Sequence, residues 1–233
     1  MERSADAVAR LREAGERILF LTNNSSRPVS DILEKLSGVG IEAKPDEIVS
    51  SALAAAAMLD EGSTALVCGG AGVDEALEQQ GVRRVHEGPA DAVVVGWFRE
   101  FDYERLTAAY KAVADGARLI GTNDDPTFPT PEGPIPGGGA LLAAVAVAAG
   151  VEAEVAGKPH QPMADLVRSR LGDDADSAIL VGDRPSTDGL MAERLAVPFA
   201  LVLSGVSGPD DVPDDPPPAH VTDDLAKLLD ELL

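Results

Sequence analysis

Three short stretches of this sequence carry side chains that could hold a phosphate group or a cation. Residues 22–26 read Thr-Asn-Asn-Ser-Ser, and hydroxyls, amides and backbone N–H groups at the start of a helix can hydrogen-bond a phosphate. Asp183 and Asp188 follow an apolar run, and carboxylate oxygens suit Mg²⁺, which takes one or two of them and completes its shell with water and substrate phosphate. Lys158, in a Gly-Lys-Pro triplet, could neutralise phosphate charge.

Each stretch also has an ordinary structural explanation when it is taken alone. The first is compatible with a helix N-cap and turn, the second with a Gly-Asp turn, and a lysine in a loop is usually solvated. The combination of all three in one chain is far more specific than any of its parts.

Short apolar runs alternate with segments whose apolar residues have helical spacing, which is typical of an α/β fold with a mostly parallel sheet. In such a sheet, ligands bind at the carboxyl ends of the strands, where residues 22–26 and Asp183 would lie. The expected strands are 18–21, 65–68, 92–95, 118–120, 178–181 and 199–203. The expected helices include segments within 32–39, 52–57, 140–149, 163–167 and 222–232, with Thr222 starting the last one.

Two segments break this alternation. Residues 121–139 hold five prolines and five glycines, which predicts a long functional loop without regular structure. Residues 207–218 are rich in Pro and Asp and predict a surface connection.

Composition limits the classes of function. The chain has 233 residues, of which 45% are hydrophobic and 25% charged, and no apolar run is long enough to span a membrane. The formal net charge of −21 would repel nucleic acid on average. The single cysteine, Cys68, ends an apolar run and has no partner for a disulfide or a zinc site, so a buried hydrophobic role in a reducing cytoplasm is expected.

The order of motifs along nearly the whole chain resembles the haloacid dehalogenase superfamily of phosphohydrolases. The resemblance is to subfamily IIA, the NagD-like and glycerol- or pyridoxal-phosphate-phosphatase-like branch. The matching motifs are LFLTNNSSRP at 19–28, Thr-Asn-x-Asp at 122–125, Gly-Lys-Pro at 157–159, Val-Gly-Asp-Arg at 181–184 and Val-Leu-Ser-Gly-Val at 202–206.

This resemblance implies a Rossmann-like core formed by residues 1–51 and 153–233, with an inserted α/β cap domain of the C2 type at residues 52–152. It also implies a cytoplasmic, Mg²⁺-dependent phosphatase that hydrolyses a small phosphorylated metabolite. The cap would select the substrate, and a homodimer formed through the cap is possible. Neither a nucleic acid nor a membrane is expected as a partner.

The resemblance also implies roles for individual residues. The second motif would hold the transferring phosphoryl group through Asn23, with Thr22 and Asn24 near it. Lys158 would offset the charge of the nucleophile and the phosphate. A metal site would comprise Asp183, which binds Mg²⁺, and Asp188, which supports the ion directly or through water.

One departure from the family is serious. Its members begin with a strand that ends in Asp-x-Asp, whose first carboxylate attacks phosphorus to form an aspartyl-phosphate and whose second acts as acid and base. Nothing before Thr22 matches, and Asp6 lies in a helical pattern. We therefore expect that the first core strand is missing, that its two neighbours expose unpaired edges, and that the chain as written is inactive. Either Met1 is an internal start, so that the sequence is truncated, or the chain is a non-catalytic module that binds a phosphate ligand or a protein.

A dinucleotide-binding domain is a third hypothesis. Gly70-Ala71-Gly72 follows an expected strand, as in the G-x-G-x-x-G motif, but Glu75 occupies the position of the third small residue. This departure argues against dinucleotide binding.

Overall fold

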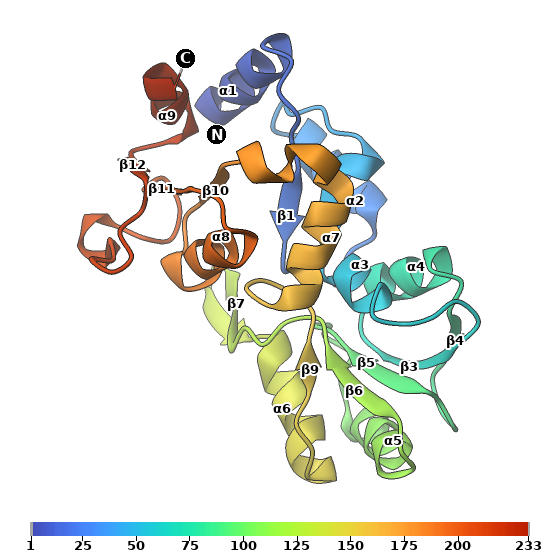
Figure 1. The fold of residues 1–233 in the computed structure, drawn as a ribbon. Coiled ribbons are helices and arrows are strands. Elements are labelled where there is room, and N and C mark those ends of the chain that lie inside the picture. Colours follow the sequence, from blue (N-terminus) through green and yellow to red (C-terminus); the bar gives the residue numbers. More distant parts are fainter. Residues whose placement is uncertain (1, 233) are drawn as a thin grey trace. The chain divides into compact units, whose positions relative to one another are not determined.

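The computed structural model describes residues 2–232, so that Met1, the suggested internal start, lies outside the described part (Figure 1). The chain divides into two compact units. The first unit comprises the described residues of Met1–Phe20, Ile32–Ile48 and Lys158–Leu233, and the second comprises Leu21–Asp31 and Val49–Gly157. The predicted core and cap boundaries, at residues 51/52 and 152/153, stay a prediction.

The second unit is built on a five-stranded parallel sheet with strand order β4-β3-β5-β6-β9. Its strands β3 and β5 are buried along their whole length, because helices cover parallel sheets on both faces, and their sequences are accordingly continuous apolar runs. Val93 of β5 pairs with Leu66 of β3 on one side and Leu119 of β6 on the other. The strands are β3 (Thr64–Cys68), β4 (Arg83–Val85), β5 (Ala92–Val95), β6 (Arg118–Gly121) and β9 (Glu154–Val155).

Four helices belong wholly to this unit: α3 (Ser51–Ala56), α4 (Ala71–Gln79), α5 (Tyr103–Ala114) and α6 (Gly138–Ala149). The expected helices at 52–57 and 140–149 correspond to α3 and α6. Helices α5 and α6 pack on the same hydrophobic core as Leu66, Val93 and Leu119. Small residues allow close contact there, since a Cβ at Gly121 would overlap the Leu142 side chain of α6.

A β-hairpin occupies residues 127–136, so the prediction of an irregular loop over 121–139 was wrong. Its antiparallel strands are β7 (Thr127–Thr130) and β8 (Gly133–Pro136). Prolines are tolerated because both strands of a two-stranded ribbon are edge strands. The ring of Phe128 stacks on Trp97 with centroids 4.2 Å apart, and the Trp97 indole Nε1 donates to the Pro136 carbonyl at 3.0 Å. A tertiary contact thus stabilises a segment whose composition alone suggested no strand.

The first unit contains a three-stranded parallel sheet with order β10-β11-β12. Its strands are β10 (Leu180–Gly182), β11 (Phe199–Val202) and β12 (His220–Thr222). Strands β1 (Phe20–Thr22) and β2 (Ile48–Ser50), where the chain passes between the units, pair in a separate two-stranded sheet. Within residues 2–232, β10 has a strand neighbour on one edge only, and Ile179 and Val181 are each 39% exposed. Strand β10 is therefore an edge strand of this sheet, with partly exposed apolar residues in it and beside it.

The helices of this unit include α1 (Glu2–Glu13), α7 (Gln161–Leu171), α8 (Leu190–Leu195) and α9 (Leu225–Leu232), while α2 (Val29–Ser37) begins in the second unit. Helix α1 lies against α9, where Arg10 pairs with Asp230 at 2.8 Å. Thr222 ends β12 instead of starting α9, so that prediction was wrong. Asp224 caps the helix because its Oδ1 accepts from the Lys227 backbone N–H at 2.9 Å.

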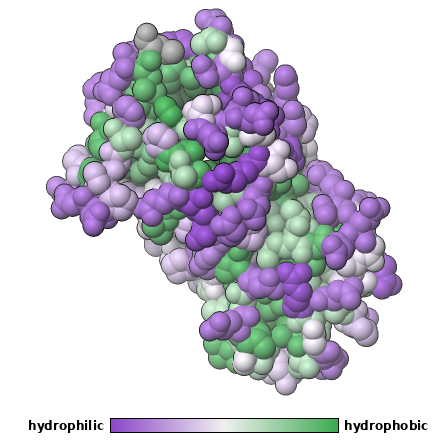
Figure 2. Space-filling model, viewed as in Figure 1, coloured by the Kyte–Doolittle hydropathy of each residue, from purple (hydrophilic) through white to green (hydrophobic). Residues whose placement is uncertain are grey.

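Hydrophilic side chains cover much of the face seen in Figure 2, in keeping with 40 acidic and 19 basic residues. No helix among the described residues is long and apolar enough to cross a membrane.

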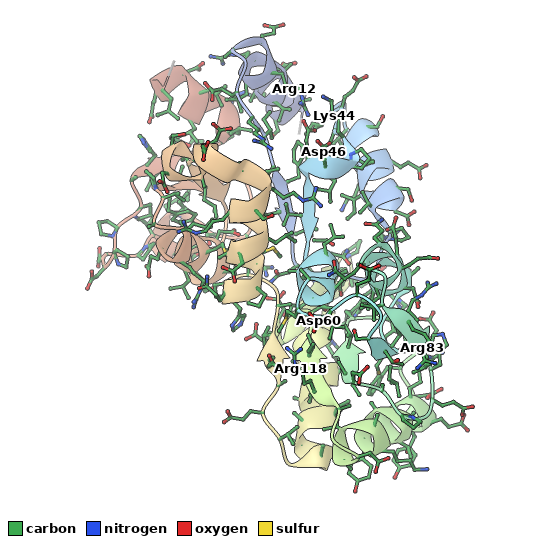
Figure 3. All side chains as sticks on the ribbon, turned by 45° about the vertical axis from the view of Figure 1, so that its right-hand side comes forward. Arg12, Lys44, Asp46, Asp60, Arg83 and Arg118 are labelled. Atoms are coloured by element: carbon green, nitrogen blue, oxygen red, sulfur yellow. The ribbon has the colours of Figure 1, made fainter. Side chains whose placement is uncertain are left out.

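Arg12 of α1 and Glu47 form a bidentate ion pair in the first unit, near the labelled Lys44 and Asp46 of Figure 3. Both N···O distances are 2.7 Å, and the Lys44 backbone N–H also donates to Glu47. The hydrogen bond from Arg12 holds the pKa of the Glu47 carboxyl below its ordinary value of 4.5. The ionised form is therefore stabilised in the folded state, and this contribution is lost as the pH falls through the lowered pKa.

We expect Glu47→Gln to reduce the free energy of unfolding by about 1 kcal/mol at pH 7, because the half-exposed arginine limits the strength of the pair. As the pH falls through the lowered pKa, the difference from the unsubstituted chain should shrink, because Glu47 becomes protonated in the folded state as well as in the unfolded state. Urea unfolding followed by circular dichroism at pH 7 and at an acidic pH at which the fold persists measures this. Glu42→Gln is the control, because Glu42 is exposed nearby. A Glu47→Gln difference that stays the same at both pH values would contradict the pH linkage.

Candidate functional site

The Thr-Asn-Asn-Ser-Ser segment begins at Thr22, the last residue of β1, and continues as a polar turn in the second unit. The Asn24 backbone N–H donates to the Thr22 hydroxyl at 3.1 Å. The Asn24 side-chain oxygen accepts from the backbone N–H and the hydroxyl of Ser26, at 3.0 and 2.7 Å. Thr22 and Asn24 therefore shape the turn, as short polar side chains commonly do.

Asn23 lies between them and is held by residues far away in the sequence. Its backbone carbonyl accepts from the Asn123 side-chain amide at 2.7 Å and from the Ser51 hydroxyl at 2.8 Å. Its side-chain Nδ2 donates to Asp125 Oδ2 at 3.1 Å. The structure thus brings the predicted residues 22–24 together with a polar loop at the carboxyl end of β6.

The sequence placed Ser25 in the polar stretch 22–26, and Asn123 and Asp125 in the matching motif at 122–125, but indicated no individual role for any of the three. Ser25 is 1% exposed, and its hydroxyl lies 2.8 Å from the hydroxyl of Thr122 in the same β6 loop. The available signal was a run of small polar residues directly after the apolar end of a strand, which is where parallel sheets place ligand sites.

Gly70 and Gly72 pack against this turn. A Cβ at Gly70 would lie 2.6 Å from the Ser26 carbonyl oxygen, and one at Gly72 would overlap the carbonyl of Arg27. Close approach of two backbone segments therefore accounts for these glycines, which had suggested the dinucleotide motif.

The second cluster lies in the first unit, at the carboxyl end of β10. Asp188 is 4% exposed, and its Oδ1 accepts from Lys158 Nζ at 2.7 Å. Its Oδ2 accepts from the backbone N–H groups of Asp183 and Arg184, at 3.2 and 3.1 Å. Both oxygens of Asp188 thus have donors from the protein, and the lysine is held beside the turn that carries Asp183.

Asp183 is fixed from the other side by the loop after β11. Its Oδ2 accepts from the Val206 backbone N–H at 2.7 Å. A Cβ at Gly205 would overlap the Asp183 carboxylate, and one at Gly182 would overlap Asp188, so glycine is required at both positions. The structure therefore brings Lys158, Asp183 and Asp188 together.

The donor set of this cluster fits a hard divalent cation. Asp183 uses Oδ2 for its backbone contact, so Oδ1 is the oxygen suited to ligation, and Mg²⁺ commonly takes only one or two carboxylates. Asp188 fits an indirect role better than direct ligation, because its oxygens accept three hydrogen bonds from protein groups. Within residues 2–232, no group of three or more His, Cys, Asp and Glu side chains forms a complete cage.

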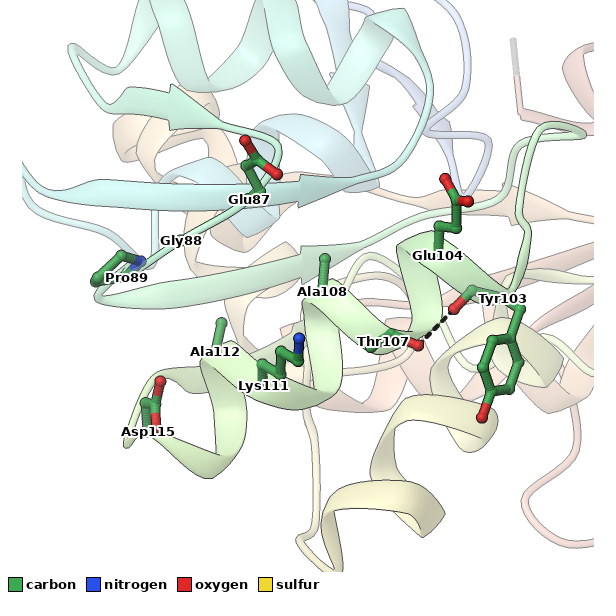
Figure 4. Close-up of a pocket in the computed structure, with 10 residues that line it drawn as sticks. All are labelled: Glu87, Gly88, Pro89, Tyr103, Glu104, Thr107, Ala108, Lys111, Ala112 and Asp115. Carbon is green, nitrogen blue, oxygen red and sulfur yellow. Dashed lines mark hydrogen bonds between the residues drawn. The ribbon is translucent and has the colours of Figure 1, made fainter.

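A cavity of about 670 Å³ lies beside α5 in the second unit, and Figure 4 shows the residues around it. Its lining includes Glu87, Glu104 and Asp115 with one lysine, Lys111, and none of the predicted site residues. An anion would meet mostly like charge there. We therefore do not assign the phosphate site to this cavity.

Cys68 is 1% exposed at the end of β3. Burial raises the pKa of its thiol to about 12, so the thiolate needed for nucleophilic attack is absent at neutral pH. The prediction of a buried hydrophobic cysteine is confirmed.

Family models and known proteins match this chain. A haloacid dehalogenase-like hydrolase model matches residues 1–83, and a HAD-hydrolase-like model matches residues 155–228. An acid sugar phosphatase of Staphylococcus aureus (strain USA300) is 34% identical over 218 residues, which are 92% of this chain and 84% of that protein. The chain belongs to the haloacid dehalogenase superfamily, subfamily IIA.

Solved structures of phosphatases share this fold. A p-nitrophenyl phosphatase from Archaeoglobus fulgidus superposes with a TM-score of 0.92 at 30% identity, covering 99% of this chain and 92% of that one. A glycerol phosphate phosphatase from Mycobacterium tuberculosis, in complex with calcium, has a TM-score of 0.87 at 32% identity, covering 96% and 68%. The α/β fold with parallel sheets is confirmed, and membership of this family implies a divalent cation.

Proposed function

We propose that this chain is an Mg²⁺-dependent phosphatase component for small phosphomonoesters, of the size of a sugar phosphate or glycerol phosphate. The observation that carries the proposal is the Lys158–Asp188–Asp183 cluster at the carboxyl end of β10. The positively charged Lys158 side chain and two carboxylates lie together at the carboxyl end of a parallel strand, where such sheets bind ligands. The phosphatases among its relatives support the reaction class.

Each residue has a role that follows from its chemistry. Lys158 offsets phosphate charge, and Asp188 fixes the lysine and the turn around Asp183. Asp183 would hold Mg²⁺ through a carboxylate oxygen, and the bound ion would polarise the phosphoryl oxygens. Asn23 would donate its side-chain N–H to a phosphoryl oxygen, in a turn shaped by Thr22 and Asn24.

A second candidate function is a module that binds a phosphate ligand without turnover. It is favoured by one observation, which is that no stretch before Thr22 matches the Asp-x-Asp motif of the family. In the covalent route that carboxylate would attack phosphorus, form an aspartyl-phosphate and release the alcohol. We therefore propose that residues 1–233 alone bind a phosphomonoester but do not hydrolyse it.

The test is to incubate the 233-residue chain with p-nitrophenyl phosphate and Mg²⁺, and to measure orthophosphate binding by calorimetry in parallel. We expect orthophosphate to bind and no p-nitrophenol to form above the level of the Asp183→Asn variant. Release that depends on Asp183 would establish the phosphatase and refute inactivity. Absence of both binding and release would refute the proposed site.

A further inference from the structure

A contact in the second unit joins the predicted phosphate-holding residue to a carboxylate 102 residues away in sequence. Asp125 Oδ2 accepts from Asn23 Nδ2 at 3.1 Å, and Asp125 is partly buried. A carboxylate beside an anion site weakens anion binding by repulsion. Its place next to Asn23 therefore needs another reason.

The reason is the polarity of the Asn23 amide. An ionised carboxylate can only accept hydrogen bonds, so it attracts the NH₂ end of the amide and repels the oxygen end. On the other side, a Cβ at Gly157 would lie 2.7 Å from Asn23 Oδ1, so the oxygen end rests against backbone. Phosphoryl oxygens are also acceptors only, and they need the NH₂ end.

The loop that carries Asp125 is itself fixed. The Asp125 backbone N–H donates to Asn123 Oδ1 at 3.3 Å, and its carbonyl accepts from the Gly139 N–H at 2.9 Å. The Gly137 N–H closes the base of the β7–β8 hairpin on the Pro126 carbonyl at 2.9 Å. A carboxylate held in this way can set the orientation of its partner instead of following it.

We infer that Asp125 is a positioning residue, which turns the Asn23 amide so that its nitrogen faces the phosphoryl group. This inference rests on the proposed function of Asn23. This positioning strengthens phosphate binding, whereas the negative charge of Asp125 by itself weakens it.

Asp125→Asn separates the two effects because it keeps the shape of the side chain. Asparagine can both donate and accept, so it no longer favours one orientation of Asn23. We expect the orthophosphate dissociation constant of the full chain, in the presence of Mg²⁺, to rise at least about threefold, although removal of a negative charge alone would lower it. Glu132→Gln, which removes an exposed carboxylate from the same hairpin, should leave the constant unchanged or slightly lower.

Asn23→Ala completes the test and should raise the orthophosphate dissociation constant by at least about tenfold. Unchanged or tighter binding in Asp125→Asn, while Asn23→Ala weakens binding, would overturn the positioning role alone. Normal binding by Asn23→Ala, or none by the unsubstituted chain, would overturn the proposed function and this inference with it.

The side-chain ¹H–¹⁵N signals of Asn23 give a second readout without phosphate, because loss of the Asp125 contact should move the hydrogen-bonded N–H upfield. Signals that stay in place would overturn the positioning role even if a variant were unstable.

Discussion

Lys158→Ala is expected to weaken orthophosphate binding by at least about tenfold, and to cut turnover severely in any form of the protein that catalyses. The lysine is the cation held beside the two carboxylates at the end of β10, with its Nζ 2.7 Å from Asp188 Oδ1. Charge-assisted hydrogen bonds are the strong ones, and loss of one to a phosphate costs roughly 1.5–3 kcal/mol. Calorimetric titration with orthophosphate measures the effect.

The same substitution should also lower the free energy of unfolding by about 2–3 kcal/mol. The Asp188 side chain is 6% exposed, and loss of its cation leaves a buried carboxylate with only two backbone N–H donors. Adding Asp188→Asn to Lys158→Ala removes that charge and should recover part of the stability, which urea unfolding of both single variants and the double variant would show.

Lys35→Ala is the matched control, since Lys35 is an exposed lysine of α2. It should change neither phosphate affinity nor stability appreciably. If Lys158→Ala left the phosphate affinity, or the turnover rate of a catalysing form, within a factor of about two, the charge-offset role would be wrong.

Asp183→Asn is expected to abolish Mg²⁺ binding and Mg²⁺-dependent turnover while leaving the fold largely intact. The carboxylate charge is lost, but an amide oxygen can still accept from the Val206 N–H that fixes this side chain. For the unsubstituted chain, Mg²⁺ at about 100 times its dissociation constant should stabilise the fold by about 2.7 kcal/mol, and this increment should vanish in the variant. Thermal unfolding with and without Mg²⁺ measures it.

Asp176→Asn is the control for this change, because it removes the same charge from an exposed position in the same unit. It should retain the full Mg²⁺-induced stabilisation. An Asp183→Asn variant that is stabilised by Mg²⁺ as strongly as the unsubstituted chain would refute the metal assignment.

Two of the strands that the sequence predicted well, β3 and β5, are buried along their whole length. Residues 92–95 form β5 with the expected bounds, because a parallel strand covered on both faces must be apolar throughout. The edge strands β4 and β9 were missed, since both are short and carry charged residues such as Arg83 and Glu154. Arg118 of β6, which is labelled in Figure 3, forms an ion pair with Glu154 of the edge strand β9. The hairpin at 127–136 was missed for a related reason, since stacking of Phe128 on Trp97 supports it.

By itself, the sequence determined the α/β class, the family and the chemical types gathered at strand ends, because these depend on local periodicity and on motifs a few residues long. The tertiary structure alone decided which hydrogen bonds those residues make. Asp188 is committed to Lys158 and two backbone N–H groups, and Asn23 is tied to Asp125 across 102 residues. Contacts of that range depend on how distant loops meet at the ends of strands, and no local pattern along the chain encodes their geometry.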